Sequence, residues 1–168
     1  MDRREAVDQL KQTYLILSQD LDEIVAYGKS NPSPFAHRTL VRTHFALIEG
    51  LSYQMRQVTL ASLEKHEGLL TPEEICLLRE EKYEADSNGS VKARTQNLRP
   101  LPGLLFSIEC YLKNHGATFK PDTSVHGWEC MKKLVKIRNN LTHPKSSADL
   151  QLSEEDLMHV AKAAGWWK

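Results

Sequence analysis

The spacing of apolar residues is the feature that most constrains how this chain can fold. Along several segments the apolar residues recur three and four positions apart, which places them on one face of an α-helix. The first two segments are long, from about Asp2 to Tyr27 and from about Pro34 to His66. Between them, Gly28 is an expected helix stop, and two prolines follow it. Two long amphipathic helices in succession predict a helical bundle.

A third, shorter helix is predicted from its start signal, TPEE at 71–74. Thr71 suits the N-cap, Pro72 suits the first helical position, and Glu74 completes a capping box. This helix is expected to end near Glu81. Three further helices follow from apolar spacing and capping residues: about Pro102–Asn114, about Val125–Thr142, and a last one that begins after Ser153 and runs to about Trp167.

The segment KYEADSNGSVKAR (82–94) breaks the helical pattern. Asn88-Gly89 favours positive φ at both turn positions, and the flanking residues alternate in character, so a small β-hairpin is predicted at about 82–96. The expected fold is therefore all-α: a bundle of five to six helices with a hairpin insertion, in a single domain over residues 1–168.

Composition limits the function classes. The 22 basic and 22 acidic residues cancel, so any nucleic-acid-binding surface must be local. The three cysteines are widely spaced and contain no Cys-x-x-Cys pair, which is typical of reduced, buried thiols. The N-terminal MDRREAVDQL lacks the apolar run of a signal peptide, and no apolar run reaches membrane-spanning length. We therefore expect a cytoplasmic protein without a cofactor or a metal site.

Arg138, in KIRNNLTHPK (136–145), occupies an unusual place on its predicted helix. At about 100° per residue it lies within the apolar stripe, whereas the lysines and Asn140 lie opposite. The apolar neighbours on the stripe are Met131, Leu134, Val135 and Leu141. A desolvated guanidinium needs a hydrogen-bonded anionic partner. Glu49 and Glu109 are the candidate partners inside the protein, and a phosphate is the candidate outside it.

His143 follows five residues later and directly precedes Pro144. A residue before proline disfavours the α conformation, so the helix is expected to end at Thr142 or His143. Histidine changes charge near neutral pH, as a general acid or base requires. Arg138 and His143 are thus candidates for a phosphate clamp and a proton-transfer group. The alternative is a plain capped helix end, because an Arg-x4-His spacing alone is common.

GWECMKKLVKIRNNLTHPKS (127–146) resembles the signature helix of the HEPN superfamily (higher eukaryotes and prokaryotes nucleotide-binding domain). That family's pattern is Arg, four to six residues, then His, often with Asn or Asp after the Arg; Arg138, Asn139 and His143 match it. The resemblance implies a metal-independent endoribonuclease. In it, His143 would assist attack by the ribose 2′-OH, Arg138 would hold the scissile phosphate, and Asn139 would orient them.

The same resemblance implies the biological setting and the partners. Catalytic members of the family act in toxin–antitoxin and anti-phage defence systems and commonly form homodimers in which two motifs line one cleft. RNA and a second copy of the chain are therefore the expected partners, with an antitoxin or another protein as a further one. A local basic surface for RNA is a candidate role for six residues: Lys132, Lys133, Lys136, Lys145, Arg94 and Arg99. A solvated face balanced by acidic neighbours is the alternative.

Other residues give weaker indications of a site. His37 and His44 are seven apart on the second helix and would share a face, but no third metal ligand has helical spacing with them. Cys110 and Cys130 are expected in the core.

Two function classes stay open at this stage. The first is the endoribonuclease; the second is a non-catalytic HEPN module that binds a partner protein, a nucleotide or RNA. Arg138 paired with Glu49 or Glu109 inside the bundle, with His143 pointing away, would favour the module. Both side chains facing one open basic cleft would favour the nuclease.

Overall fold

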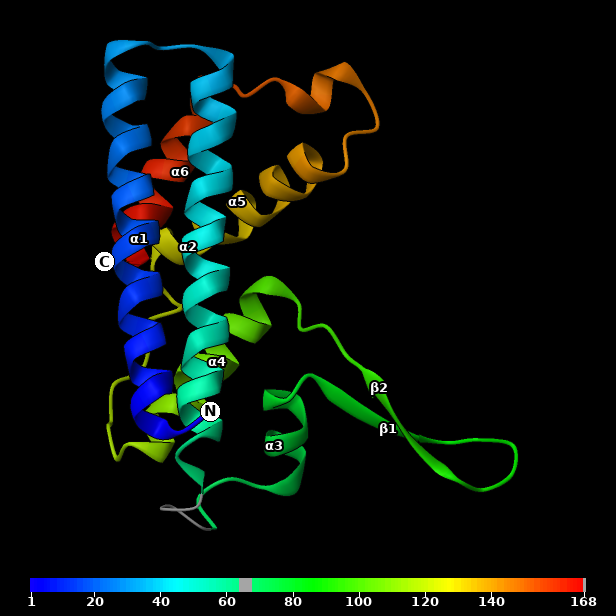
Figure 1. The fold of residues 1–168 in the computed structure, drawn as a ribbon. Helices are drawn as coiled ribbons and strands as arrows, with labels where there is room; N and C mark the ends of the chain where they lie inside the picture. Colours follow the sequence, from blue (N-terminus) through cyan, green and yellow to red (C-terminus); the bar gives the residue numbers. More distant parts are fainter. Residues whose placement is uncertain (64–67, 168) are drawn as a thin grey trace. The chain divides into compact units, whose positions relative to one another are not determined.

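The structure is a computed structural model that describes residues 1–63 and 68–167. Over these residues the chain is mostly helical, with six α-helices and one two-stranded antiparallel sheet (Figure 1). It divides into two compact units, which are described separately. We call Met1–Thr13 with Gly50–Lys120 the hairpin unit, and Tyr14–Glu49 with Pro121–Lys168 the motif unit. Helices α1 (Arg3–Ser30) and α2 (Pro34–Leu60) contribute residues to both.

The hairpin unit contains α3 (Pro72–Leu78), β1 (Glu81–Ala85), β2 (Val91–Thr95) and α4 (Pro100–Asn114). The predicted capping box of α3 is confirmed: the Glu74 amide donates to Thr71 Oγ1 at 3.2 Å, and the Thr71 amide donates to Glu74 Oε2 at 2.7 Å. A small apolar cluster of this unit forms around Leu70, Leu78 and Cys110.

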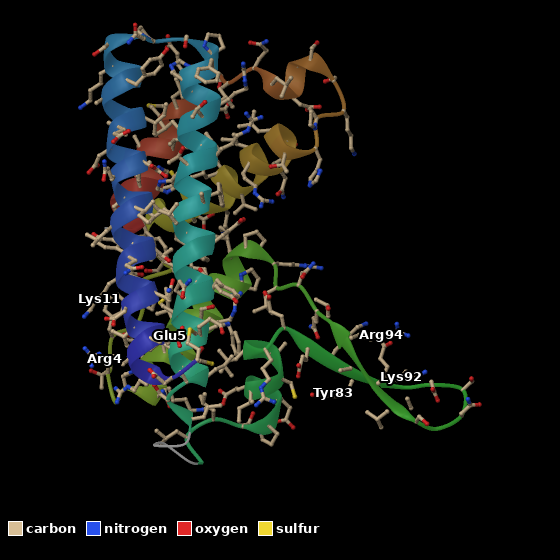
Figure 2. The ribbon with its side chains drawn as sticks, in the orientation of Figure 1. Arg4, Glu5, Lys11, Tyr83, Lys92 and Arg94 are labelled. Carbon is tan, nitrogen blue, oxygen red and sulfur yellow. The ribbon has the colours of Figure 1, made fainter. Side chains whose placement is uncertain are left out.

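The predicted hairpin is confirmed, with β1 and β2 antiparallel and Tyr83 opposite Ala93. Its turn differs from the prediction, because only Gly89 has positive φ, at 77°, and Asn88 does not. Instead, Asp86 Oδ1 accepts the amides of Asn88 and Ser90, and this side-chain bonding shapes a wider loop. The strands are almost fully exposed, as the labelled side chains of Tyr83, Lys92 and Arg94 illustrate (Figure 2).

The motif unit ends with α5 (His126–Thr142), the 3₁₀ turn η2 (Ser147–Leu150) and α6 (Glu154–Trp167). Helix α5 packs against α6 (Figure 1). Ser153 caps α6 as predicted, with its Oγ accepting the Asp156 amide at 3.1 Å. The buried apolar side chains of α5 and α6 are Trp128, Cys130, Met131, Leu134, Leu141, Val160 and Ala163.

Three predicted helix ends are wrong. Helix α1 continues through Gly28 to Ser30. Helix α2 ends at Leu60 and not at His66, which lies outside the described residues. Near the end of this helix, the hydroxyls of Thr59 and Ser62 donate to backbone carbonyls four residues back. Such local bonds compete with the regular backbone hydrogen bonds of a helix.

Helix α3 ends at Leu78 and not near Glu81, because Glu80 takes a positive φ of 56° and turns the chain into β1. Arg56 holds the Glu80 carboxylate at 2.9 Å in this conformation. No helix in the described part of the chain combines the length and the apolar character that crossing a membrane requires.

Candidate active site

Helix α5 carries the motif, and its packing agrees with the predicted stripe. Met131, Leu134 and Leu141 are buried, whereas Asn140 on the opposite side is exposed. The helix ends at Thr142, as predicted, because His143 directly precedes Pro144 and a residue in that position disfavours the α conformation. His143 is the C-cap, with φ −129° and ψ 62°, and its amide donates to the Asn139 carbonyl at 2.9 Å. The local sequence thus places His143 just outside the last helical turn.

Arg138 is anchored by three contacts within the motif unit. Its Nη2 donates to Glu49 Oε1 at 2.7 Å, and its Nη1 donates to Asn139 Oδ1 at 3.2 Å. Its guanidinium carbon lies 5.8 Å from the centroid of the Phe45 ring, within the range of a cation–π contact. Of the two predicted carboxylate partners, the structure selects Glu49; Glu109 belongs to α4 in the hairpin unit.

The Arg138–Glu49 pair is only partly desolvated. The Arg138 side chain is 25% exposed and the Glu49 side chain 41% exposed. This is the ion pair that the sequence associated with a binding module, but it lies at the edge of the packed region and not inside it. Because a guanidinium carries five N–H groups, those not used by Glu49 and Asn139 remain to bind another anion.

The His143 side chain is exposed. Its ring makes no hydrogen bond with any residue that the structure describes, so the structure links Arg138 with Asn139 and leaves His143 unattached to both side chains. An exposed, unattached imidazole beside a helix end is accessible to a substrate.

Arg42 is a residue near the motif that the sequence analysis missed. It is exposed, and its Nη2 donates to the Leu141 carbonyl at 3.2 Å, two residues before His143. The available signal was the spacing of Arg42, Phe45 and Glu49 along one face of α2, at i, i+3 and i+7. That spacing indicates a shared face, but only the packing of α2 on α5 shows what the face touches.

The six candidate RNA-binding residues divide between the units. Arg94, in β2, and Arg99, the N-cap of α4, belong to the hairpin unit, whereas the four lysines belong to the motif unit. Lys132 pairs with Glu129 at 2.6 Å, and Lys133 lies 3.9 Å from Glu155.

Lys136 and Lys145 are exposed and form no ion pair with a described residue. Arg94 lies 3.7 Å from Glu84. The predicted basic surface is thus partly neutralised, and among its four lysines Lys136 and Lys145 are the two without an acidic partner among the described residues.

The remaining candidate residues are two cysteines and two histidines outside the motif of α5. Cys110 is buried, which confirms it as a core residue, and burial raises the pKa of its thiol to about 12. Cys130 is also buried, with its sulfur 3.5 Å from His126 Nε2 and 3.6 Å from His159 Nδ1. His37 and His44 do share a face, since both line one cleft, but no group of three or more metal-ligating side chains suited to an ion occurs among the described residues.

The chain was compared with protein-family models, with curated proteins and with solved structures. None matches. The resemblance to HEPN proteins therefore remains an expectation from the sequence, carried by the pattern of Arg138, Asn139 and His143.

Proposed function

We propose that this protein is a metal-independent endoribonuclease of the HEPN type, with Arg138, Asn139 and His143 as its active site. The observation that carries the proposal is the state of the motif at the end of α5. Arg138 is anchored at a partly exposed position, and five residues later the exposed His143 ring follows the helix end. An oriented cation and an accessible acid/base group are the two parts that cleavage through a ribose 2′-OH requires.

In this mechanism His143 takes the proton of the ribose 2′-OH, and the oxygen attacks the adjacent phosphorus. The bond to the 5′-oxygen breaks, that oxygen takes a proton from the protonated motif histidine of the second chain or from water, and a 2′,3′-cyclic phosphate remains on the upstream fragment. Arg138 stabilises the charge that builds on the phosphoryl oxygens through the N–H groups that Glu49 and Asn139 leave unused. Arg42, whose Nη2 donates to the Leu141 carbonyl, adds a second cation near the end of α5.

A homodimer is part of this proposal. Each chain supplies one motif histidine, so a C2 arrangement of two chains would supply both an acid and a base. Sedimentation and the dilution dependence of cleavage per chain test this directly. A monomer at micromolar concentration whose specific activity does not change on dilution would contradict it. In the cell, such an enzyme would serve as a toxin or an anti-phage effector in the cytoplasm.

A second function is favoured by one observation. The Glu49 carboxylate, 2.7 Å from Arg138, offsets the charge that would bind a phosphate. An arginine kept for this ion pair, with no chemistry attached, would fit a module that binds a partner protein, a nucleotide or RNA. The two functions predict opposite results in a cleavage assay.

The deciding experiment incubates the purified chain with labelled RNA in excess EDTA, beside a DNA strand of the same sequence. We expect RNA cleavage with 2′,3′-cyclic ends and no cleavage of DNA, which lacks the 2′-OH. His143→Ala should lower the rate by roughly 10²–10⁴-fold, the usual contribution of a general acid or base. Arg138→Lys should not restore full activity, because an ammonium cannot make the forked contact.

Asn140→Ala is the matched control, since this residue is exposed on the other side of the same helix. It should cleave at the wild-type rate, and all variants should melt near the wild-type temperature except Arg138→Ala. Equal cleavage by wild type and His143→Ala would reject the nuclease and leave the binding module.

A further inference from the structure

A cleft in the motif unit is separate from the proposed active site. It has a volume of about 410 Å³ and is lined by residues of α1, α2 and α6, none of which belongs to the motif of α5. This volume is in the range of small-molecule sites, about 300–1,000 Å³. The lining is mainly aliphatic, and includes Leu21, Ile24, Val25, Leu40, Leu157 and Val160.

His44 is the exception to this apolar lining. It is only 1% exposed, and neither Nδ1 nor Nε2 has a hydrogen-bond partner in the described structure. Buried polar groups are almost always hydrogen-bonded, because an unpaired one loses its hydration without compensation. Burial also lowers the pKa of His44 to about 4, so the ring is neutral at physiological pH and offers one N–H donor and one nitrogen acceptor.

We propose that this cleft binds a small uncharged organic molecule, with an apolar body and one hydroxyl group that hydrogen-bonds to His44. The aliphatic lining matches the apolar body. A hydroxyl both donates and accepts, so it can pair with either nitrogen of a neutral imidazole. A pure hydrocarbon would leave His44 unpaired, and a charged group would be desolvated beside a neutral ring.

The charges around the cleft also favour a neutral ligand. Asp22 and Lys29, both exposed, contribute one charge of each sign to the lining, so they give no net preference for an anion or a cation. His37 is the remaining titratable group of the lining and is half-buried.

Two probes that differ by one hydroxyl test the proposal: para-butylphenol and butylbenzene. Titration calorimetry on the full chain measures their dissociation constants, and NMR of the labelled histidine ring nitrogens reports contact with His44. We expect para-butylphenol to bind roughly tenfold more tightly than butylbenzene, and to shift the His44 ring resonances. His44→Leu replaces the imidazole with an apolar side chain of similar size. This variant has no hydrogen-bonding group at that position, so it should bind both probes about equally.

Gly28 provides a second variant that leaves His44 untouched. A Cβ at Gly28 meets only Ala36 Cβ, at 3.9 Å, so Gly28→Ala should fold and bind like the wild type. Gly28→Leu extends a branched side chain beside the cleft lining and should weaken binding of both probes at least tenfold.

The proposal is overturned if the wild type binds neither probe below millimolar concentration, or if the preference for para-butylphenol survives in His44→Leu. It is also overturned if Gly28→Leu binds both probes as tightly as Gly28→Ala. Should His44→Leu fail to fold, the Gly28 pair and the His44 resonances decide the question without it.

Discussion

Gly127 is the position at which a single added methyl group should disturb the packing of α5 most sharply. A Cβ at this residue would lie 2.7 Å from Trp166 Cβ, 3.3 Å from Trp166 Cγ and 3.4 Å from the Lys162 carbonyl oxygen. Carbon atoms in favourable contact are about 3.5–4.0 Å apart, so α6 must move by about 1 Å. Trp166 resists this movement, because its Nε1 donates to the Asp122 carbonyl at 2.7 Å and its ring packs on Trp128 at a centroid distance of 4.9 Å.

The size of the effect follows from two opposing contributions. Overpacking of this kind costs about 1–3 kcal/mol. Replacing a helical glycine by alanine returns up to about 1 kcal/mol, and less at Gly127, which is the second residue of α5. Gly127→Ala should therefore lower the free energy of unfolding by about 1–2 kcal/mol. For a chain of this length that corresponds to a fall of roughly 2–8 °C in Tm.

Gly165→Ala is the matched control. It lies in α6, and a Cβ there meets nothing within 4 Å, so the substitution should leave Tm unchanged or raise it by up to about 4 °C. Thermal melts followed by circular dichroism, with urea unfolding at one temperature, measure both variants. If Gly127→Ala is as stable as the wild type, or if both variants change stability in the same direction and by the same amount, the close approach of α5 and α6 is refuted.

Three further predictions concern stability. The pKa of His44 is about 4 in the folded chain and near 6.5 in the unfolded chain, so below pH 6.5 the unfolded state binds more protons. The free energy of unfolding should therefore fall by about 3 kcal/mol between pH 6.5 and pH 4. In His44→Leu this fall should be smaller. A double-mutant cycle on Arg138 and Glu49 should give a coupling below about 1 kcal/mol, because both side chains are partly exposed; a value near 3 kcal/mol, typical of a buried pair, would contradict that exposure. Thr71→Ala should cost about 1 kcal/mol in urea unfolding through loss of the α3 cap, and no loss would show that the capping box contributes nothing.

The sequence predicted those features that depend on neighbours in the chain. Helical spacing, the Thr71 and Ser153 caps, and the end of α5 before Pro144 are set by contacts within a few residues, and the structure confirms them. The prediction that Arg138 lies on the apolar side of α5 belongs to the same class, since helix geometry alone fixes it.

Where local signals compete, the sequence was less informative. Gly28 suggested a helix stop, but the backbone continues for two more residues. Asn88-Gly89 suggested a tight turn, but Asp86 supplies hydrogen bonds that make a wider loop more favourable. Near the end of α2, the Thr59 hydroxyl donates to the backbone carbonyl of Met55. Glu80, with its positive φ, is held by an ion pair between its side chain and that of Arg56, which is distant in the sequence. Apolar spacing records neither contact.

Only the tertiary structure decided which partners meet across helices. Glu49 and Glu109 were equal candidates for Arg138 until the packing of α2 against α5 selected Glu49. The same packing brought Arg42 to the Leu141 carbonyl. Residues of α1 and α6 join α2 in an apolar cleft around His44, which has no hydrogen-bond partner among the described residues and which the sequence showed only as one histidine of a helical pair. Helix periodicity determines which face a residue occupies, but the residue opposite that face comes from a segment far away in the sequence, and only the folded chain specifies it.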